Sequence, residues 1–375
     1  TVDRSRRLTH QYDQQEGLTM NDLKQLVNTG RSHTRHGEAV QFQEGLYQLS
    51  KQCYGWMVPN GSWGETNIGL IDCHGKSVLI DTCWDLHFTR QMLEGMQPVI
   101  EKSPIDTVIN THSDGDHCWG NQLFKDRNII ATQSCHAQMH HMKPASLSAL
   151  QHSCKALRHV PFGGMNTFSN YMIDMLAPYQ FGGIHITEPG LTFQQEHSLN
   201  LNGKDIVLYE VGPGHTSGDA IVYVPDEQVV YAGDIAFIGS TPVMWSGPVE
   251  NLLRALEKLQ SLNARVIVPG HGPLANSNDI QNIIDYWHFV HENIHQRYQQ
   301  DKQPHEAASE VLYSKAFLQS PYARWSCAER MVTNAFTLYR QWGAKLTNLP
   351  EPMGTLDIMR KQAKVAHQFQ QQTAH

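Results

Sequence analysis

The 375-residue sequence lacks the features that mark several large classes of protein. It has no run of about 18 consecutive apolar residues, so it predicts no membrane-spanning helix and no membrane partner. No cluster of lysine and arginine stands out and the formal net charge is −7, which argues against nucleic acid as a partner. No apolar stretch follows Thr1 to Arg7, which is unlike a secretory signal, while a signal removed before Thr1 stays an open alternative.

A disulfide framework is also missing from the sequence. The seven cysteines are widely spaced, odd in number and include no Cys-x-x-Cys pair. This pattern favours reduced thiols, so we expect a cytoplasmic protein. With 40% hydrophobic residues, a chain of this length can bury a large core in one domain with additions.

What the sequence does contain is a dense group of metal-binding residue types between His112 and His117. Residues 105–110 are β-branched and apolar and follow a proline, which predicts a short buried strand just before the group. The group therefore lies on a loop at the carboxyl end of a strand, where open α/β sheets place their sites. The imidazoles of His112 and His117, together with the carboxylates of Asp114 and Asp116, suit a divalent metal of borderline hardness. Taken alone, the loop also fits an Asp-rich turn with surface histidines.

Three further strand ends each carry one residue of the same kind. His215 follows a Gly-Pro-Gly turn, Asp234 follows a glycine, and His271 follows Pro-Gly. The strands expected before them are residues 205–211, 229–232 and 265–268. Turn chemistry does not account for four strand ends that all offer histidine or aspartate, so these side chains are predicted to form one metal site.

In their order along the chain, the four motifs resemble those of the metallo-β-lactamase superfamily, over roughly Trp63 to Leu274. The resemblance implies an α/β fold, the αββα sandwich, with two divalent metal ions at its site. It further implies that His112, Asp114 and His215 hold the first metal, that Asp116, His117 and His271 hold the second, and that Asp234 bridges them. Cys118, next to this loop, is expected to pack behind the site and not to bind metal.

One position departs from the family's pattern. Asp114 stands where the family's His-x-His-x-Asp-His motif has its second histidine. An aspartate reaches less far than an imidazole, so the loop lies further inward, the first metal is held weakly, or Asp114 acts through a water. If Asp114 binds directly, a third carboxylate joins Asp116 and Asp234, which moves the preference from zinc toward iron or manganese. Flavodiiron proteins of this fold carry a glutamate there. The remaining alternative is that Asp114 turns to solvent as a loop-capping residue.

The chain is predicted to divide into three parts. These are an N-terminal arm over 1–50, a catalytic domain over 51–277 with an insert over 133–196, and a helical C-terminal extension over 278–375. Within the arm, which we expect to wrap the domain or a partner subunit, Thr19–Val27 is predicted as a helix. The other predicted elements are a hairpin over 67–72 and 77–82, helices over 86–96 and 249–262, and tail helices over 278–300, 305–318, 324–343 and 355–372.

Three further groups of residues are candidates for a role around the site. Asp81 ends the hairpin and either supports the metal loop from behind or closes a plain turn. The insert is rich in methionine, aromatic residues and Gly pairs, which fits a mobile lid as well as it fits the core of a helical subdomain. In the tail, the residues that could border the pocket are Tyr322, Arg324, Trp325 and Arg330.

The leading hypothesis is a metal-dependent hydrolase of an organic ester, thioester, lactone or amide. A metal-bound hydroxide would attack the acyl carbon, with Asp116 orienting this nucleophile and Asp234 holding the metals together. The partner is then a small acyl-type substrate, and a homo-oligomer remains open. The alternatives are a non-heme di-iron oxygenase on the same fold, which Asp114 favours, and a metal-free binding protein, which would have to have lost its ligands.

Overall fold

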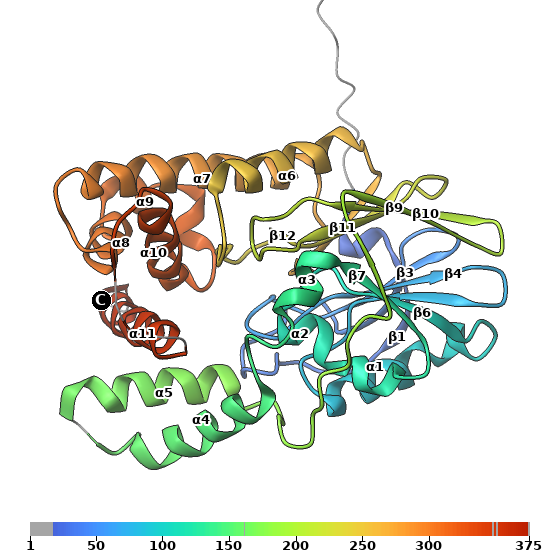
Figure 1. Cartoon of the computed structure of the whole chain (residues 1–375), viewed down its shortest axis with the longest axis horizontal. Helices are drawn as coiled ribbons and strands as arrows, with labels where there is room; N and C mark the ends of the chain where they lie inside the picture. The colour runs from blue at the N-terminus through green and yellow to red at the C-terminus, as the bar shows by residue number, and fades with distance from the viewer. Residues whose placement is uncertain (1–17, 161, 347–348, 350–351, 374–375) are drawn as a thin grey trace, which may run out of the picture.

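The computed structural model describes residues 18–160, 162–346, 349 and 352–373 of the chain. Two β-sheets lie face to face, with helices on their outer faces (Figure 1). The first sheet has the order β1-β2-β3-β4-β5-β6-β7-β8, and the second the order β13-β12-β11-β10-β9. The α/β class and the αββα sandwich that the sequence predicts are therefore confirmed.

The strands of the first sheet are β1 (Lys24–Asn28), β2 (Gly45–Gln48), β3 (Cys53–Met57), β4 (Ile68–Asp72), β5 (Ser77–Ile80), β6 (Ile105–Ile109), β7 (Asn128–Thr132) and β8 (Leu191–Phe193). Those of the second are β9 (Glu196–Leu201), β10 (Lys204–Glu210), β11 (Ala220–Val224), β12 (Val229–Phe237) and β13 (Val266–His271). Strands β5 to β8 are parallel, as are β12 and β13, and the other pairs are antiparallel. The parallel pairs bring the carboxyl ends of β6 and β12 to edges where loops converge.

The helices of the structure are α1 (Leu86–Ile100), α2 (Gly115–Cys118), α3 (Gln133–Gln138), α4 (Pro144–Leu157), α5 (Met165–Leu176), α6 (Val249–Ser261), α7 (Ser277–Tyr298), α8 (Pro304–Leu312), α9 (Lys315–Leu318), α10 (Met331–Gln341) and α11 (Met353–Thr373). Short 3₁₀ helices are η1 (Met20–Asp22), η2 (Trp119–Phe124), η3 (Phe162–Gly164), η4 (Pro321–Arg324) and η5 (Ala328–Arg330). Among the described residues, no helix combines the length and apolar character needed to span a bilayer.

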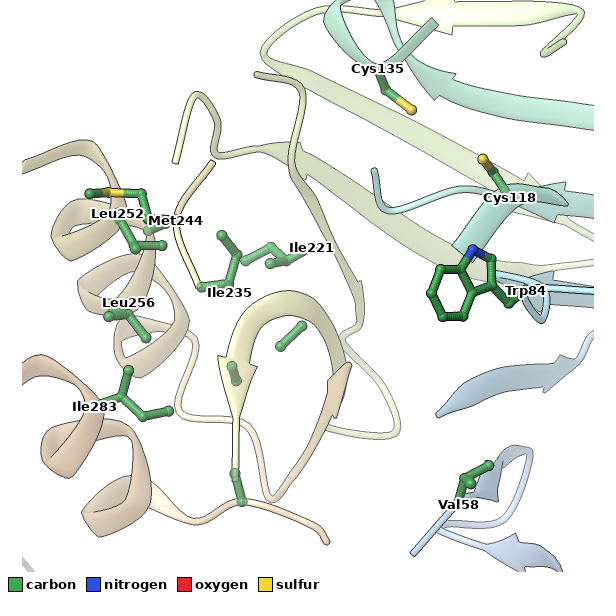
Figure 2. Packing of buried hydrophobic residues seen from close by; sticks show 14 of the residues in the cluster. Val58, Trp84, Cys118, Cys135, Ile221, Ile235, Met244, Leu252, Leu256 and Ile283 are labelled. Carbon is green, nitrogen blue, oxygen red and sulfur yellow. The ribbon is translucent and has the colours of Figure 1, made fainter. Parts of the chain in front are cut away.

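Apolar packing holds the layers together. Ile71, Ile109 and Val222 belong to the core between the two sheets. On the outer face of the second sheet, Leu252 and Leu256 project from α6 toward the sheet residues Ile221 and Ile235 (Figure 2). The sequence places leucines along one face of α6, and burial of these leucines holds the helix against the sheet.

Two local predictions are wrong. The expected helix over Thr19–Val27 is only the turn η1, closed by Thr19 and Asp22, and the chain then extends as β1 to pair with β2. Tertiary strand pairing overrides a weak local helix signal here. The predicted arm thus supplies two strands of the first sheet. The tail helix predicted over 324–343 begins only at Met331, because Cys327 takes a left-handed conformation at φ 58°.

The insert and the tail pack against each other. Helices α4 and α5 form a hairpin, and α5 lies against α11 of the C-terminal extension (Figure 1). A hydrogen-bond relay joins them: Gln362 Nε2 donates to Tyr171 Oη at 2.7 Å, and Tyr171 Oη donates to Glu329 at 3.1 Å. Part of the insert is also core, since Tyr179 and Phe181 are buried around Trp84. The insert is therefore held by the C-terminal extension through α5 and by the core of the domain through Tyr179 and Phe181.

Candidate metal centre

Four imidazoles surround the carboxylate of Asp234, which lies in β12. The distances from Asp234 oxygens to the Nε2 atoms are 3.8 Å for His112, 3.2 Å for His117, 3.3 Å for His215 and 3.4 Å for His271. These residues come from the loop after β6, from α2, from the β10–β11 loop and from the end of β13. Asp234 can lie this close to the four imidazoles because its carboxylate packs against Gly270, where any side chain would collide with it. The four strand ends that the sequence singles out therefore meet at one carboxylate.

The outer nitrogens of two imidazoles are fixed by carbonyl groups. His215 Nδ1 donates to Val243 O at 2.8 Å, and His271 Nδ1 donates to Glu65 O at 3.1 Å. Because a carbonyl can only accept, each Nδ1 must carry a proton. With Nδ1 protonated, the neutral ring has its lone pair on Nε2, the atom that faces Asp234.

Asp81 fixes the other two imidazoles. Its carboxylate accepts from Thr111 N at 2.7 Å, from Thr111 Oγ1 at 2.7 Å and from His117 Nδ1 at 2.8 Å. Since the Thr111 hydroxyl proton goes to Asp81, His112 Nδ1 is the donor in its 3.0 Å bond to Thr111 Oγ1. Both Nε2 lone pairs thus point inward as well. The prediction that Asp81 supports the loop is confirmed by these contacts, and the plain-turn alternative is not.

The donor set fits metal ions. Three buried atoms here have no hydrogen-bond partner among the described residues, namely His112 Nε2, His117 Nε2 and Asp234 Oδ1. Unsatisfied buried polar atoms are rare, and three that face one another fit a binding site for a cation. Two groups have ligand atoms within 4.8 Å of one another: His112 with His215 and Asp234, and Asp116 with His117 and His271. Their nitrogen and carboxylate donors suit zinc and similar divalent ions. The assignment of individual ligands stays a prediction.

Asp116 and Asp114 occupy different places at this centre. Asp116 Oδ2 lies 3.5 Å from His271 Nε2 and accepts from Thr66 Oγ1 at 2.9 Å. Asp114 belongs to neither three-residue group, but its Oδ2 lies 3.3 Å from His215 Nε2. It occupies the N-cap position of α2 without making a capping hydrogen bond. Its side chain is thus directed to the site and not used for the loop-capping role that the sequence left open.

Charge at the centre favours a cation. Burial would lower the pKa of both His117 and His215, but nearby carboxylates outweigh it and raise both pKa values, that of His215 to about 9. Burial lowers the pKa of His112 well below its usual range, and the neighbouring His117 adds to the effect. Burial would raise the pKa of Asp234, yet the surrounding histidines, led by His271, hold it well below its usual range. The carboxylates thus attract positive charge to the Nε2 side of the rings.

A pocket with a cavity volume of about 70 Å³ opens over the centre. Its apolar lining residues are Trp63, Trp84, Met142, Phe237, Val243 and Trp245, and its polar ones beyond the metal-type residues are Arg330, Thr333 and Gln362. Met142 comes from the insert, and the last three come from the C-terminal extension. Sequence patterns did not point to Thr333 or Gln362, because polar residues inside a helical tail carry no distinguishing signal.

Only one of the four tail residues expected at the pocket lines it. Arg330 does, whereas Tyr322, Arg324 and Trp325 are not among the lining residues, so that part of the prediction is wrong. The reason is aromatic packing on α7: Tyr286 lies 5.4 Å from Tyr322 and 5.3 Å from Trp325 between ring centroids. Cys118, as expected, is buried behind the site, with its Sγ directed to Ser113 O at 3.4 Å.

Comparison with known proteins agrees with this geometry. The model of the metallo-beta-lactamase superfamily matches residues 61–271. A metallo-beta-lactamase type 2 of Bacillus sp. (strain 170) is 21% identical over 236 residues, covering 60% of this chain and 74% of the relative. The 2,4-dinitroanisole O-demethylase subunit alpha of Nocardioides sp. (strain JS1661) is 22% identical over 216 residues, covering 56% of this chain and 53% of the relative.

Solved structures show the same fold. The inverting sec-alkylsulfatase Pisa1 from Pseudomonas sp. superposes with a TM-score of 0.59 at 17% identity, over 82% of this chain. This chain spans about half of that structure, 52% of its length. The matched share of this chain exceeds the residues of the family model, so the likeness in fold reaches beyond them. The chain belongs to the metallo-beta-lactamase superfamily, and it has that superfamily's hydrolase-like fold with candidate metal-binding residues.

Proposed function

We propose that this protein is a metal-dependent hydrolase of an organic ester, thioester, lactone or amide, with two divalent metal ions at the candidate centre. The observation that carries the proposal is the inward orientation of four imidazole Nε2 atoms around Asp234. His112, His215 and Asp114 would hold one ion and Asp116, His117 and His271 the other, with Asp234 between them. Bound there, divalent ions lower the pKa of a water molecule and draw charge from a carbonyl oxygen.

The protein's own groups prepare the reaction. Thr66 holds Asp116 Oδ2 at 2.9 Å, which leaves the other carboxylate oxygen to accept a proton from a water and orient it toward the acyl carbon. The aromatic wall of Trp63, Trp84 and Trp245 excludes bulk water and binds the organic part of the substrate. This apolar lining supports an acyl substrate over a phosphodiester. The net charge of −7 also argues against a polyanion.

The comparisons do not favour the di-iron alternative. The carboxylate of Asp114 near His215 makes the preference of the centre for iron or manganese over zinc a question for experiment. Metal content after purification and O₂ consumption separate the two. We expect close to two divalent ions per chain and no O₂ uptake. We also expect hydrolysis of p-nitrophenyl esters or thioesters, and a metal chelator should abolish this activity. Tightly held iron with O₂ consumption and no hydrolysis would reject the proposal.

Ligand variants test the site itself. We expect His117→Ala and His271→Ala each to lose one metal ion and to lower hydrolysis at least a thousandfold, while the fold is kept. His288, which is exposed on α7, provides the matched control His288→Ala. If both ligand variants keep full metal content and activity, the assignment of the second metal is wrong.

A further inference from the structure

Arg330, the last residue of η5, carries a buried charge without a carboxylate partner. Its exposed fraction is 4%, and no carboxylate oxygen of the described residues lies within 4.0 Å of its nitrogens. Its hydrogen bond runs from Nη1 to Thr241 O at 3.0 Å. The adjacent carboxylate, Glu329, accepts from Tyr171 instead. Since an unpaired buried charge costs several kcal/mol, of the order of a protein's net stability, a guanidinium at this place is set for an anion that the chain itself does not supply.

The guanidinium lies at the pocket of the candidate metal centre. Arg330 lines this pocket together with Asp114 and Asp234. Its Cζ lies 5.5 Å from the centroid of the Phe237 ring, which stacks on His271 at 5.0 Å. One aromatic ring therefore separates the cation from a predicted metal ligand. An anion bound by Arg330 would lie in the same pocket as the reacting group, yet apart from the metal centre.

Two polar residues that line the pocket with Arg330, namely Thr333 and Gln362, take part in hydrogen bonds with each other and with Tyr171. Thr333 Oγ1 donates to Gln362 Oε1 at 2.7 Å, and Gln362 Nε2 donates to Tyr171 Oη at 2.7 Å. Among the described residues that line the pocket, Arg330 is the one lysine or arginine. Its guanidinium has five N–H donors in a planar fork that matches a carboxylate. The Phe237 ring lies between the guanidinium and His271, and Val243 adds to the apolar lining of the same pocket.

We propose that Arg330 binds a carboxylate at the far end of the substrate, so that the natural substrate is an ω-carboxyacyl compound whose methylene chain lies against the apolar wall. The inference rests on the proposed hydrolase function. Arg330 lies outside the residues of the family match, 61–271, so this specificity comes from the C-terminal extension and not from the shared domain. Arg330 is here a specificity residue, since it does not touch the reacting atoms.

A matched pair of substrates tests the proposal: p-nitrophenyl hexanoate and mono-p-nitrophenyl adipate, which differ in the terminal carboxylate. In the metal-loaded wild type we expect kcat/KM to be higher for the adipate. In Arg330→Gln the ratio of the two kcat/KM values, adipate over hexanoate, should fall at least tenfold, mainly through a higher KM for the adipate. Arg330→Lys should keep part of the preference, because it keeps the charge but not the fork. The control Arg324→Gln removes an exposed arginine of the same segment and should change nothing.

A binding measurement separates this inference from the hydrolase proposal. Adipamate and hexanamide are titrated calorimetrically into metal-free protein, so that neither hydrolysis nor metal ligation contributes. We expect adipamate to bind at least tenfold more tightly in wild type and Arg324→Gln, and equally weakly in Arg330→Gln. Equal binding of both ligands by wild type would overturn the role of Arg330 even if ester hydrolysis is found. Selective binding without hydrolysis would instead reject the hydrolase proposal alone. If Arg330→Gln does not fold, the same ratio measured in Arg330→Lys must fall.

Discussion

Asp81→Asn is a sharp test of how the metal centre is built, because this one carboxylate fixes the protonation of two predicted ligands. Asp81 accepts three hydrogen bonds, two from Thr111 and one from His117 Nδ1. Asparagine keeps the shape of the side chain but replaces one acceptor oxygen with a donor. The carboxamide nitrogen cannot face Thr111 N, since two buried donors would then meet at a cost of about 1–3 kcal/mol. It must therefore face His117 Nδ1.

The consequence passes through both rings. A donor opposite His117 Nδ1 requires the lone pair there, so the proton moves to Nε2, the nitrogen that faces Asp234. The same carboxamide donates to Thr111 Oγ1, whose hydroxyl proton then turns to His112 Nδ1 and moves that ring's proton to Nε2 as well. Each wrong tautomer weakens one metal. We expect the affinity of each metal to fall by about 10–100-fold, which corresponds to about 1.4–2.7 kcal/mol.

The assay is zinc titration in competition with a chromophoric chelator, with urea unfolding of the metal-free protein in parallel. Asp106→Asn serves as the control, because Asp106 lies on β6 and pairs at the surface with Lys76 at 2.7 Å. We expect the control to bind zinc like the wild type. A folded Asp81→Asn variant with undiminished affinity for both metals would refute the tautomer reasoning.

Three further predictions test other parts of the structure. Asp114→His should raise the preference for zinc over iron about tenfold, because it replaces a hard oxygen donor 3.3 Å from His215 Nε2 with an imidazole. Competition between zinc and iron for the metal-free protein measures this preference. An unchanged preference would mean that Asp114 is not a ligand. Met142→Ala should lower kcat/KM for long-chain esters by about five- to tenfold and leave kcat/KM for acetyl esters unaffected, since it removes the insert's contribution to the pocket wall. Equal effects on both kinds of ester would contradict a contact between Met142 and the acyl chain. Hydrogen bonds from Ser50 and Lys204 outweigh burial and lower the pKa of Glu227, so its stabilising contribution is present above pH 4.5 and lost as the pH falls through the lower folded-state pKa. Urea unfolding of Glu227→Gln should thus show a loss of about 1 kcal/mol at pH 7 that shrinks below pH 4.5, with a smaller loss in Asp226→Asn, whose side chain is more exposed.

The sequence by itself determined the class of fold and the candidate site. Apolar, β-branched runs followed by histidine or aspartate were sufficient to predict β6, β12 and β13 and to propose seven residues for the metal site, although Asp234 and His271 lie within β12 and β13 and not in turns after them. The family resemblance supplied how these ends come together, and the family match over residues 61–271 confirms it. Asp81 was also a candidate from the sequence, because it stands at the end of the hairpin predicted over 67–72 and 77–82.

Only the tertiary structure decided what surrounds the site. Thr19–Val27 reads locally as a helix, but the edge of the first sheet offers β1 unpaired hydrogen-bonding groups that outweigh so weak a local preference. Thr333 and Gln362 look like ordinary polar residues of a helical tail, and their place at the pocket depends on how α11 packs against α10 and against α5 of the insert. Strand ends are set by short-range patterns, whereas a pocket wall is built from side chains far apart in the chain, whose meeting depends on the packing of whole elements.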